Sequence, residues 1–407
     1  MLFDYYIIQD SSKGKTVVLL LITVIIFLLT LIHERLLLNS RIQSIPLRIS
    51  VTGTRGKSSV ARLLASILRE DGWKVLAKTT GSEARLILTD GEEIPLSRRG
   101  IPSILEQKKL IKFAKNVNAD CVVSEIMSIH PENHFVESQQ ILKPNIVIVT
   151  NIRRDHIDAM GKTEDEIASV LSLDIPEKAR VYIPEKENRQ IFQTAVHNGK
   201  GELIIVPEGI SSPLQQLAPE LKRTEFSDNL DIVVSLAKHL NIDQRVIYNG
   251  IRNTKHDIGT FKIWEYCARE TQKTCYLVNG FAANDPESTK RLISKTKEVL
   301  PSASDKLTGL LSLRPDRGDR TVQWINALQD RSFDCFSRIY VTGTHSKIIK
   351  RKLKFAYILK YKPPEKMTDM IVTDLEDQAV IFGFGNLVGM GRRLVDCWNT
   401  IGEAYGI

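Results

Sequence analysis

The chain has 407 residues, a formal net charge of +8, and apolar and charged fractions of 43% and 26%. This length allows two or three domains with their own cores, and the ordinary composition excludes a disordered or low-complexity chain. The positive charge permits an acidic partner, although a lysine-rich solvated surface explains it equally well. Because no long basic block occurs, we expect no nucleic-acid partner.

The cysteines also restrict the class of protein. They form no CxxC pair and show no ligand spacing with histidine; they are Cys121, Cys267, Cys275, Cys335 and Cys397. An odd, scattered set is typical of reduced thiols in the cytosol and argues against a disulfide framework. We assign none of them chemistry.

Residues 16–32 (TVVLLLITVIIFLLTLI) contain no charged side chain. Their number matches the short end of what spans a bilayer, roughly 17–25 residues. A cleaved signal peptide is the alternative, but no small-residue cleavage site follows the run. We predict an uncleaved membrane anchor, assign residues 1–38 to anchor and linker, and interpret residues 38–45 as a short polar linker. The flanking charges do not fix the orientation of the anchor.

Residues 51–59 (VTGTRGKSS) lie between an apolar run that predicts a buried strand and an amphipathic run that predicts a helix. A strand, a glycine loop, Lys-Ser and a helix form the arrangement that cradles nucleotide phosphates. The position of Val51 departs from the general pattern, which has glycine there, and a structural turn is the alternative. The predicted nucleotide-binding residues are Gly53, Thr54, Arg55, Gly56, Lys57, Ser58 and Ser59. Since ATP is cytosolic, we expect the catalytic body in the cytoplasm and a single pass through the cell membrane.

Two further apolar strands end in polar residues. Residues 121–127 (CVVSEIM) contain Glu125, and residues 145–152 (NIVIVTNI) precede Asp155 and His156. In an α/β sheet the carboxyl ends of parallel strands line the ligand crevice, so the phosphate loop, this carboxylate and this imidazole should meet at one edge. Glu125 is a candidate Mg²⁺ ligand or a member of a structural ion pair. His156 fits a metal ligand and a core histidine about equally.

The second half of the chain repeats the α/β pattern. After a junction at residues 253–259, strands are predicted at residues 275–278, 307–313, 338–341, 370–372 and 379–382, and helices at residues 286–300 and 321–328 and from residue 387. We expect a central domain at residues 39–265 and a smaller α/β domain at residues 266–407. Residues 341–347 (VTGTHSK) echo the phosphate loop, but Ser346 replaces its second glycine, so a simple turn is the better interpretation.

In this order and spacing, the phosphate loop, Glu125 and residues 151–158 (NIRRDHID) resemble motifs of the Mur ligase superfamily, which includes folylpolyglutamate synthetases. The resemblance accounts for Val51 and implies a P-loop central domain of that type. It implies that Asn151 belongs to the nucleotide site. More loosely, residues 279–286 (NGFAANDP) and 313–320 (LRPDRGDR) resemble C-terminal segments of the family. The resemblance assigns Asp316 and Arg317 to ATP contacts.

Two departures from the superfamily restrict the substrate and the site. The anchor occupies the place where Mur enzymes carry a domain that binds a uridine-diphosphate sugar, so a UDP-linked muropeptide is not expected. Members of the family place a lysine about fifteen residues after the motif histidine, whereas here residues 169–172 read SVLS. Another group must then steady the metal.

With its anchor, the chain resembles the ligases of bacterial poly-γ-glutamate (capsule) synthesis. This resemblance implies ATP-driven addition of glutamate to growing poly-γ-glutamate, with Mg²⁺ as cofactor and other membrane subunits of a synthetase complex as partners. It implies catalytic roles for Lys57, Glu125 and His156, and metal binding by Ser58, Glu125 and His156. Arg55, Arg153 and Arg154 are candidate contacts for substrate carboxylates. The alternatives are another polyglutamylating ligase and a membrane-tethered regulatory ATPase.

Overall fold

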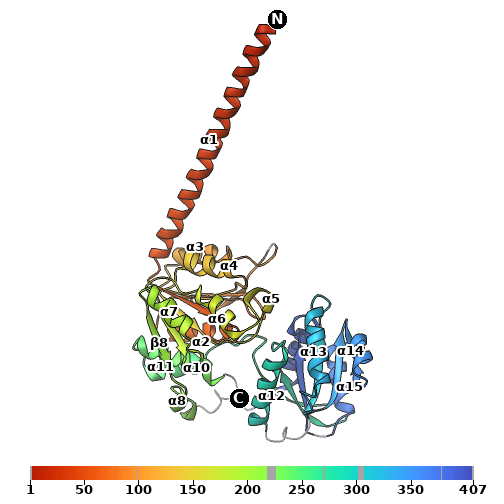
Figure 1. Cartoon of the computed structure of the whole chain (residues 1–407). Coiled ribbons are helices and arrows are strands. Elements are labelled where there is room, and N and C mark those ends of the chain that lie inside the picture. The colour runs from red at the N-terminus through yellow and green to blue at the C-terminus, as the bar shows by residue number, and fades with distance from the viewer. Residues whose placement is uncertain are drawn as a thin grey trace.

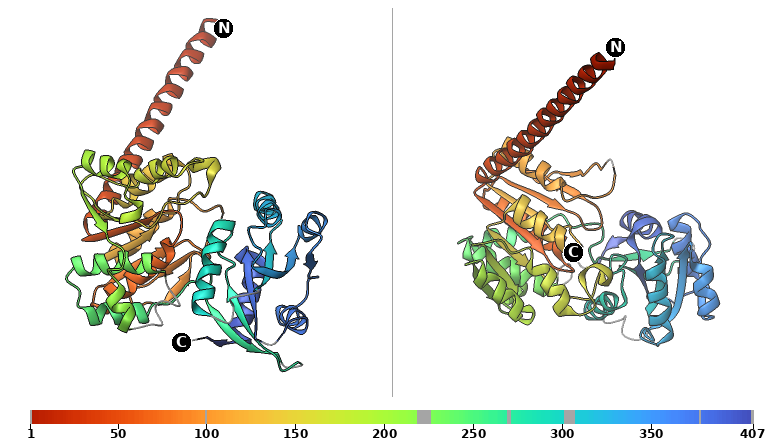
Figure 2. Two further views of the ribbon diagram at one scale, coloured as in Figure 1. Left: turned by 60° about the horizontal axis from the view of Figure 1, so that its bottom comes forward. Right: turned by 45° about the horizontal axis from the view of Figure 1, so that its top comes forward.

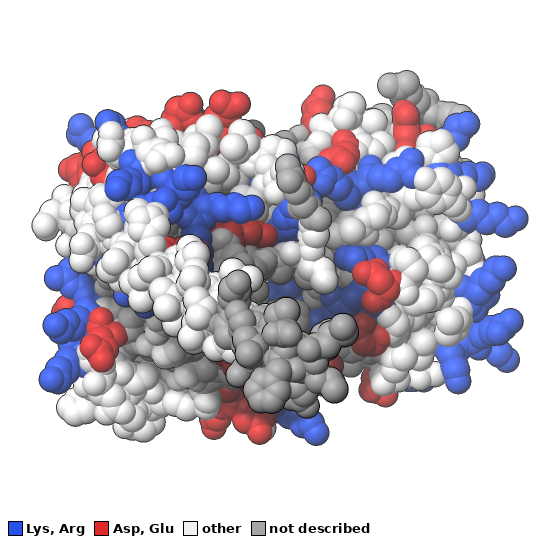
Figure 3. Space-filling model, turned by 90° about the horizontal axis from the view of Figure 1, so that it is seen from above, with Lys and Arg blue, Asp and Glu red and all other residues white. Residues whose placement is uncertain are grey.

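The computed structural model describes residues 2–98, 100–217, 226–268, 271–300, 307–376 and 378–405. A long N-terminal helix projects from the first of two α/β units, and the second unit lies beside the first (Figures 1 and 2). Seen from the side on which the helix projects, a hollow separates the two units, with charged side chains of both signs along its walls (Figure 3).

The N-terminal helix α1 (Leu2–Gln43) is longer than the apolar run. Its side chains are exposed through most of residues 16–36, and the segment Thr16–Gln43 is long and apolar enough to cross a membrane. The predicted polar linker at residues 38–45 is wrong, because α1 continues as far as Gln43. Leu38, Ile42 and Ile45 are buried, and they pack with Leu110 and other apolar residues beneath α3 (Glu106–Asn116).

The first unit is built on an eight-stranded sheet with the order β4-β3-β2-β5-β1-β6-β7-β8. Its strands are β1 (Leu47–Thr52), β2 (Val75–Thr79), β3 (Arg85–Ile87), β4 (Glu93–Pro95), β5 (Cys121–Glu125), β6 (Ile146–Val149), β7 (Arg180–Pro184) and β8 (Glu202–Val206). Its helices after α1 are α2 (Lys57–Glu70), α3 (Glu106–Asn116), α4 (Pro131–Phe135), η1 (Val136–Leu142), α5 (Ile157–Met160), α6 (Glu164–Ser172), η2 (Glu185–Glu187), α7 (Gln190–Asn198), α8 (Ser212–Leu217), α10 (Ser227–His239) and α11 (Gln244–Arg252).

The order of this sheet brings the predicted motifs together. Strand β1 lies between β5 and β6 and runs parallel to both, with Val51 paired to Glu125 and Thr52 paired to Val149. The phosphate loop, Glu125 and the segment after β6 therefore leave the sheet at the same edge, as the strand pattern predicted. β3 and β4 are short antiparallel additions beyond β2.

The second unit contains a seven-stranded sheet with the order β13-β12-β11-β14-β10-β9-β15. Its strands are β9 (Ile263–Cys267), β10 (Thr274–Asn279), β11 (Leu307–Leu313), β12 (Phe336–Gly343), β13 (Ala356–Ile358), β14 (Ala379–Gly385) and β15 (Glu403–Ala404). Its helices are α12 (Pro286–Val299), α13 (Gly318–Gln329), α14 (Ser346–Lys352), α15 (Pro364–Thr373), η4 (Leu387–Gly391) and α16 (Arg392–Ile401). The predicted domain division after residue 265 falls inside β9.

One predicted strand of this unit is wrong. Residues 370–372 belong to helix α15, which begins at Pro364. Met367 and Ile371 are both fully buried, and their spacing of four residues places them on one face of a helix. A short apolar run does not by itself distinguish a strand from the end of an amphipathic helix.

Candidate active site

The phosphate loop has a backbone that only glycine adopts easily at two positions. Gly53 and Gly56 have φ angles of 123° and 82°, in the left-handed region. A Cβ atom at Gly53 would lie 2.2 Å from the Thr150 hydroxyl oxygen, so the loop also approaches the end of β6 closely. Lys57 begins α2, and its ammonium donates a hydrogen bond to the Gly53 carbonyl at 2.7 Å. The ammonium group thus lies across the loop that would hold phosphates.

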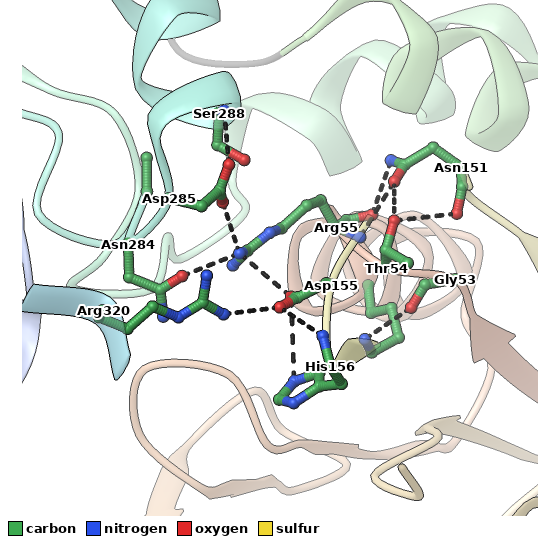
Figure 4. A network of polar contacts seen from close by, with 12 residues as sticks. Gly53, Thr54, Arg55, Asn151, Asp155, His156, Asn284, Asp285, Ser288 and Arg320 are labelled. Atoms are coloured by element: carbon green, nitrogen blue, oxygen red, sulfur yellow. Dashed lines mark hydrogen bonds and ion pairs between the residues drawn. The ribbon is translucent and has the colours of Figure 1, made fainter. Parts of the chain in front are cut away.

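Asn151 fixes the conformation of this loop from the neighbouring strand. Its Oδ1 accepts hydrogen bonds from the Thr54 hydroxyl at 2.8 Å and from the Arg55 backbone N–H at 3.0 Å, and its Nδ2 donates to the Arg55 carbonyl at 2.9 Å (Figure 4). Thr150 donates to the same carbonyl at 2.6 Å. These contacts tie the chain segments that follow β1 and β6 into one rigid loop.

Ser58 and Glu125 bring oxygen ligands together beside the loop. The Ser58 hydroxyl donates to Glu125 Oε2 at 2.8 Å, and the Thr80 backbone N–H donates to the same oxygen at 2.6 Å. Within the described residues no group of three His, Cys, Asp or Glu side chains could hold a metal by itself. Mg²⁺ suits such a sparse set, because it usually binds through one or two carboxylates together with waters and substrate phosphates.

A cavity of about 170 Å³ opens between these groups. It is lined by loop residues, by groups at the ends of β2 and β5, and by histidines from two segments. Among the lining residues are Gly53, Thr54, Lys57, Thr80, Glu125, His134, His156 and Leu171. The predicted phosphate loop, carboxylate and imidazole therefore share one cavity. The wall also contains residues that were not predicted as site residues, among them His134 and Leu171.

His156 lies at the mouth of the cavity, with 41% of its side chain exposed. It adopts a left-handed conformation with φ 48° and precedes the short helix α5. Burial lowers the pKa of its imidazole, and the charges of Lys57 and Arg55 lower it further, against the opposite effect of Asp155. A lowered pKa favours the neutral ring, which is the form in which histidine binds a metal.

The two units meet at a cluster of charged groups around Arg55 (Figure 4). Arg55 Nη2 lies 2.7 Å from Asp285 Oδ2, 2.8 Å from Asn284 Oδ1 and 3.1 Å from Asp155 Oδ2. Arg320, in the first turn of α13, donates to Asp155 Oδ1 at 2.8 Å. Burial alone would raise the pKa of the Asp155 carboxyl, but the charges of Arg55, His156 and Arg320 lower it to about 2.

Other predicted contact residues form ion pairs within their own unit. Asp316 accepts from the Arg314 guanidinium at 2.9 Å, and Arg317 lies 3.4 Å from Asp319. The side chain that reaches the central unit from this segment is Arg320, which the sequence did not single out although it ends the stretch of residues 313–320. Arg153 is paired with Glu187 at 2.8 Å. Both Arg153 and Arg55, which were predicted to contact substrate carboxylates, therefore already have carboxylate partners within the protein.

Comparison with known proteins agrees with this geometry. Residues 51–248 match the Mur ligase middle domain, and residues 265–401 match the poly-gamma-glutamate synthase CapB C-terminal domain. The PGA synthase CapB of Bacillus subtilis is 30% identical over 386 residues, which are 93% of this chain and 96% of that protein. The chain belongs to the poly-γ-glutamate synthase family. The capsule biosynthesis protein CapB of Bacillus anthracis is 31% identical over 78% of this chain and 69% of its own length.

The same fold occurs in solved structures of folylpolyglutamate synthases. The E. coli FolC structure in complex with ADP matches with a TM-score of 0.67 and 15% identity, over 91% of this chain and 93% of that chain. A Yersinia pestis folylpolyglutamate synthase/dihydrofolate synthase with Mn, AMPPNP and L-glutamate bound matches with a TM-score of 0.62 and 13% identity, over 89% and 91%. These matches confirm the predicted Mur-ligase-like fold. The synthase is thus an ATP-dependent amide ligase that acts in poly-γ-glutamate synthesis.

Proposed function

We propose that the synthase elongates poly-γ-glutamate at the cavity beside the phosphate loop, using ATP and Mg²⁺. The observation that carries the proposal is that the phosphate loop has polar partners on both sides. Ser58, at the start of α2, bonds to Glu125, and Arg55 of the loop contacts Asn284 and Asp285 of the C-terminal unit. A ligase needs its phosphate site to lie next to a second unit that can cover the substrates.

The loop residues would bind the nucleotide. The N–H groups of the Gly53–Gly56 turn and the N-terminus of α2 form an anion site, and Lys57 would leave the Gly53 carbonyl to contact the terminal phosphates. Thr54, Arg55 and Ser59 would shape this turn, with Asn151 fixing it. Asp316 and Arg317 stay predicted ATP contacts.

Mg²⁺, when bound, would neutralise negative charge on the phosphates. Ser58 and Glu125 would hold it, and we retain His156 as a further ligand. The donor set fits, because the Ser58 hydroxyl oxygen and the Glu125 carboxylate already lie within hydrogen-bond distance of each other.

The chemistry requires activation because a carboxylate is a poor electrophile at neutral pH. An oxygen of a glutamate γ-carboxylate would attack the γ-phosphorus of ATP, and the bond to the β–γ bridging oxygen would break to release ADP. The amine of another glutamate would then attack the acyl carbon, lose a proton and displace inorganic phosphate. In-line phosphoryl transfer depends mainly on positioning and charge neutralisation, which Lys57 and the loop supply.

The membrane setting is also part of the proposal. The exposed apolar part of α1 would cross the cell membrane once, with both α/β units on the cytoplasmic side where ATP is present. Glu34 is paired with Lys108 of α3 at 2.7 Å, so the end of α1 is held to the body. Other membrane subunits would join the synthase there. Leu20→Lys together with Ile26→Lys should release the protein from washed membranes, and retention of the double variant would contradict the anchor.

Lys57→Ala and Glu125→Ala test the catalytic part. Both should lose at least 100-fold in glutamate-dependent ATP hydrolysis, and mass spectrometry should detect no elongated polymer. Lys347→Ala is the matched control. Lys347 is exposed, and in the similar sequence of residues 341–347 it occupies the position that Lys57 has in the phosphate loop. Full activity in both site variants would refute the proposal. If the rate of ATP hydrolysis did not depend on glutamate and no amide product formed, the result would favour a regulatory ATPase.

A further inference from the structure

His134 is a buried histidine on the wall of the nucleotide cavity. It belongs to the short helix α4 and its side chain is 2% exposed. It lines the same cavity as Lys57, Glu125 and His156. Neither the phosphate loop nor the motif around His156 includes it.

A carboxylate behind the ring fixes its orientation. His134 Nδ1 lies 2.9 Å from Asp174 Oδ2, and Asp174 is fully buried after α6. The same oxygen accepts from the Thr52 hydroxyl at 2.5 Å, and the Asp174 carbonyl accepts from the Ser138 hydroxyl at 2.6 Å. An ionised carboxylate is an acceptor only, so Nδ1 carries the proton and the lone pair of a neutral ring lies on Nε2.

The Nε2 atom of His134 is the unusual feature. It is buried and has no hydrogen-bond partner among the described residues. Buried polar atoms without a partner are rare and costly, and an ion or an ordered water is a common reason for one. The unpartnered indole nitrogens of Trp264 and Trp324 differ, because these residues belong to apolar cores and do not line this cavity.

We propose that His134 Nε2 is a nitrogen ligand of the divalent ion in this cavity, oriented by Asp174. At metal sites, a histidine ligand commonly donates one ring N–H to a carboxylate, which orients the ring, and binds the metal through its other nitrogen. His134 has the carboxylate partner and an unpartnered second nitrogen. Leu171, in the stretch where the sequence offers no lysine, lines the same wall with an apolar side chain and supplies no ligand. The proposal rests on the proposed function, which places the ion beside Ser58 and Glu125.

Mn²⁺ is the appropriate probe because it accepts both oxygen and nitrogen ligands and is paramagnetic. Binding of Mn²⁺ to the detergent-solubilised full chain, in the presence of AMPPNP, would be measured by EPR of the free ion. His134→Asn keeps an amide N–H for Asp174 but removes Nε2, whereas His134→Gln places an oxygen close to the Nε2 position. We expect Mn²⁺ affinity to fall at least tenfold in the first variant and less than threefold in the second. His239→Asn, an exposed histidine bonded to Tyr182, is the matched control.

A pulsed EPR measurement identifies the nitrogen directly. In a His156→Gln background, the ¹⁴N coupling to bound Mn²⁺ should persist with His134 and disappear with His134→Asn. An unchanged affinity together with an unchanged ¹⁴N coupling would overturn the proposal. Thermal unfolding without metal separates misfolding from ligand loss, and His134→Gln keeps the test valid if His134→Asn does not fold. A wild type that binds Mn²⁺ through His134 but makes no polymer would refute the proposed function alone.

Discussion

Arg320 of the C-terminal unit donates a hydrogen bond at 2.8 Å to Asp155 of the central unit, and both side chains are buried. Asp155 also lies 3.1 Å from Arg55 of the phosphate loop. One carboxylate therefore connects the nucleotide loop to the second unit. The contact gives a physical route by which loop occupancy and the placement of the C-terminal unit depend on each other.

Loss of Arg320 should weaken this connection. Arg320→Ala leaves Asp155 with Arg55 as its remaining arginine partner, and breaking a buried ion pair costs roughly 3–5 kcal/mol. We expect a lower thermal midpoint and at least a tenfold drop in kcat/KM for ATP. Arg291→Ala, at an exposed position on α12, should change neither. Equal effects of the two substitutions would show that the contact does not hold the units together.

Asp155 should make stability depend on acid pH. Its pKa in the folded protein is about 2, below the ordinary aspartate value of 3.8. A depressed carboxyl pKa contributes stability that is fully present above the unfolded pKa and is lost as pH falls through the folded value. Asp155→Asn should therefore be destabilised near neutral pH, and its thermal midpoint should fall less than that of the wild type between pH 4 and pH 2. If the thermal midpoints of the two proteins fell equally between pH 4 and pH 2, the lowered pKa of Asp155 would be contradicted.

Gly53 should not tolerate a side chain. In Gly53→Ala the new Cβ would meet the Thr150 oxygen at 2.2 Å and would require a φ of 123°. We expect loss of measurable AMPPNP binding by calorimetry. Gly318→Ala is the control, because no atom lies within 4 Å of its Cβ and it begins α13. If Gly53→Ala bound the nucleotide normally, the loop would not hold phosphates as proposed.

Asn151 should affect nucleotide affinity through the shape of the loop. Asn151→Ala removes the bonds to the Thr54 hydroxyl and to both backbone groups of Arg55. Each net hydrogen bond is worth about 1 kcal/mol, so we expect AMPPNP affinity to fall at least tenfold with the fold retained. Asn116→Ala, at the exposed end of α3, serves for comparison. Unaltered affinity would limit Asn151 to a structural role.

The end of α1 should contribute to the stability of the body. Leu38 is 4% exposed and Leu37 is 39% exposed, although they are neighbours. Leu38→Ala should destabilise the protein by about 2–4 kcal/mol, as for buried leucines in general. Leu37→Ala should change stability by less than about 0.5 kcal/mol. Thermal unfolding in detergent compares the two, and similar midpoints would show that α1 does not dock on α3.

Several short elements had too little local signal to be predicted. β3, β4, β13 and β15 contain only two or three residues each, and they form because neighbouring strands offer open edges. The segment at residues 370–372 is helical because its buried face packs beneath the second sheet, which periodicity over three residues does not show. Residues 38–45 looked like a linker because their buried side chains are spaced among polar ones.

By itself the sequence determined the phosphate loop, the buried strands before Glu125 and Asn151, the apolar N-terminal run and the repeated α/β pattern. These features depend on residues close together in the chain, so composition and periodicity reveal them. Only the tertiary structure decided that Arg320 contacts Asp155 and that Asp174 orients His134. Those partners lie 165 and 40 residues apart, and the order of the parallel strands brings them to one edge. Charge pairing and burial at that edge then decide which side chains face the cavity.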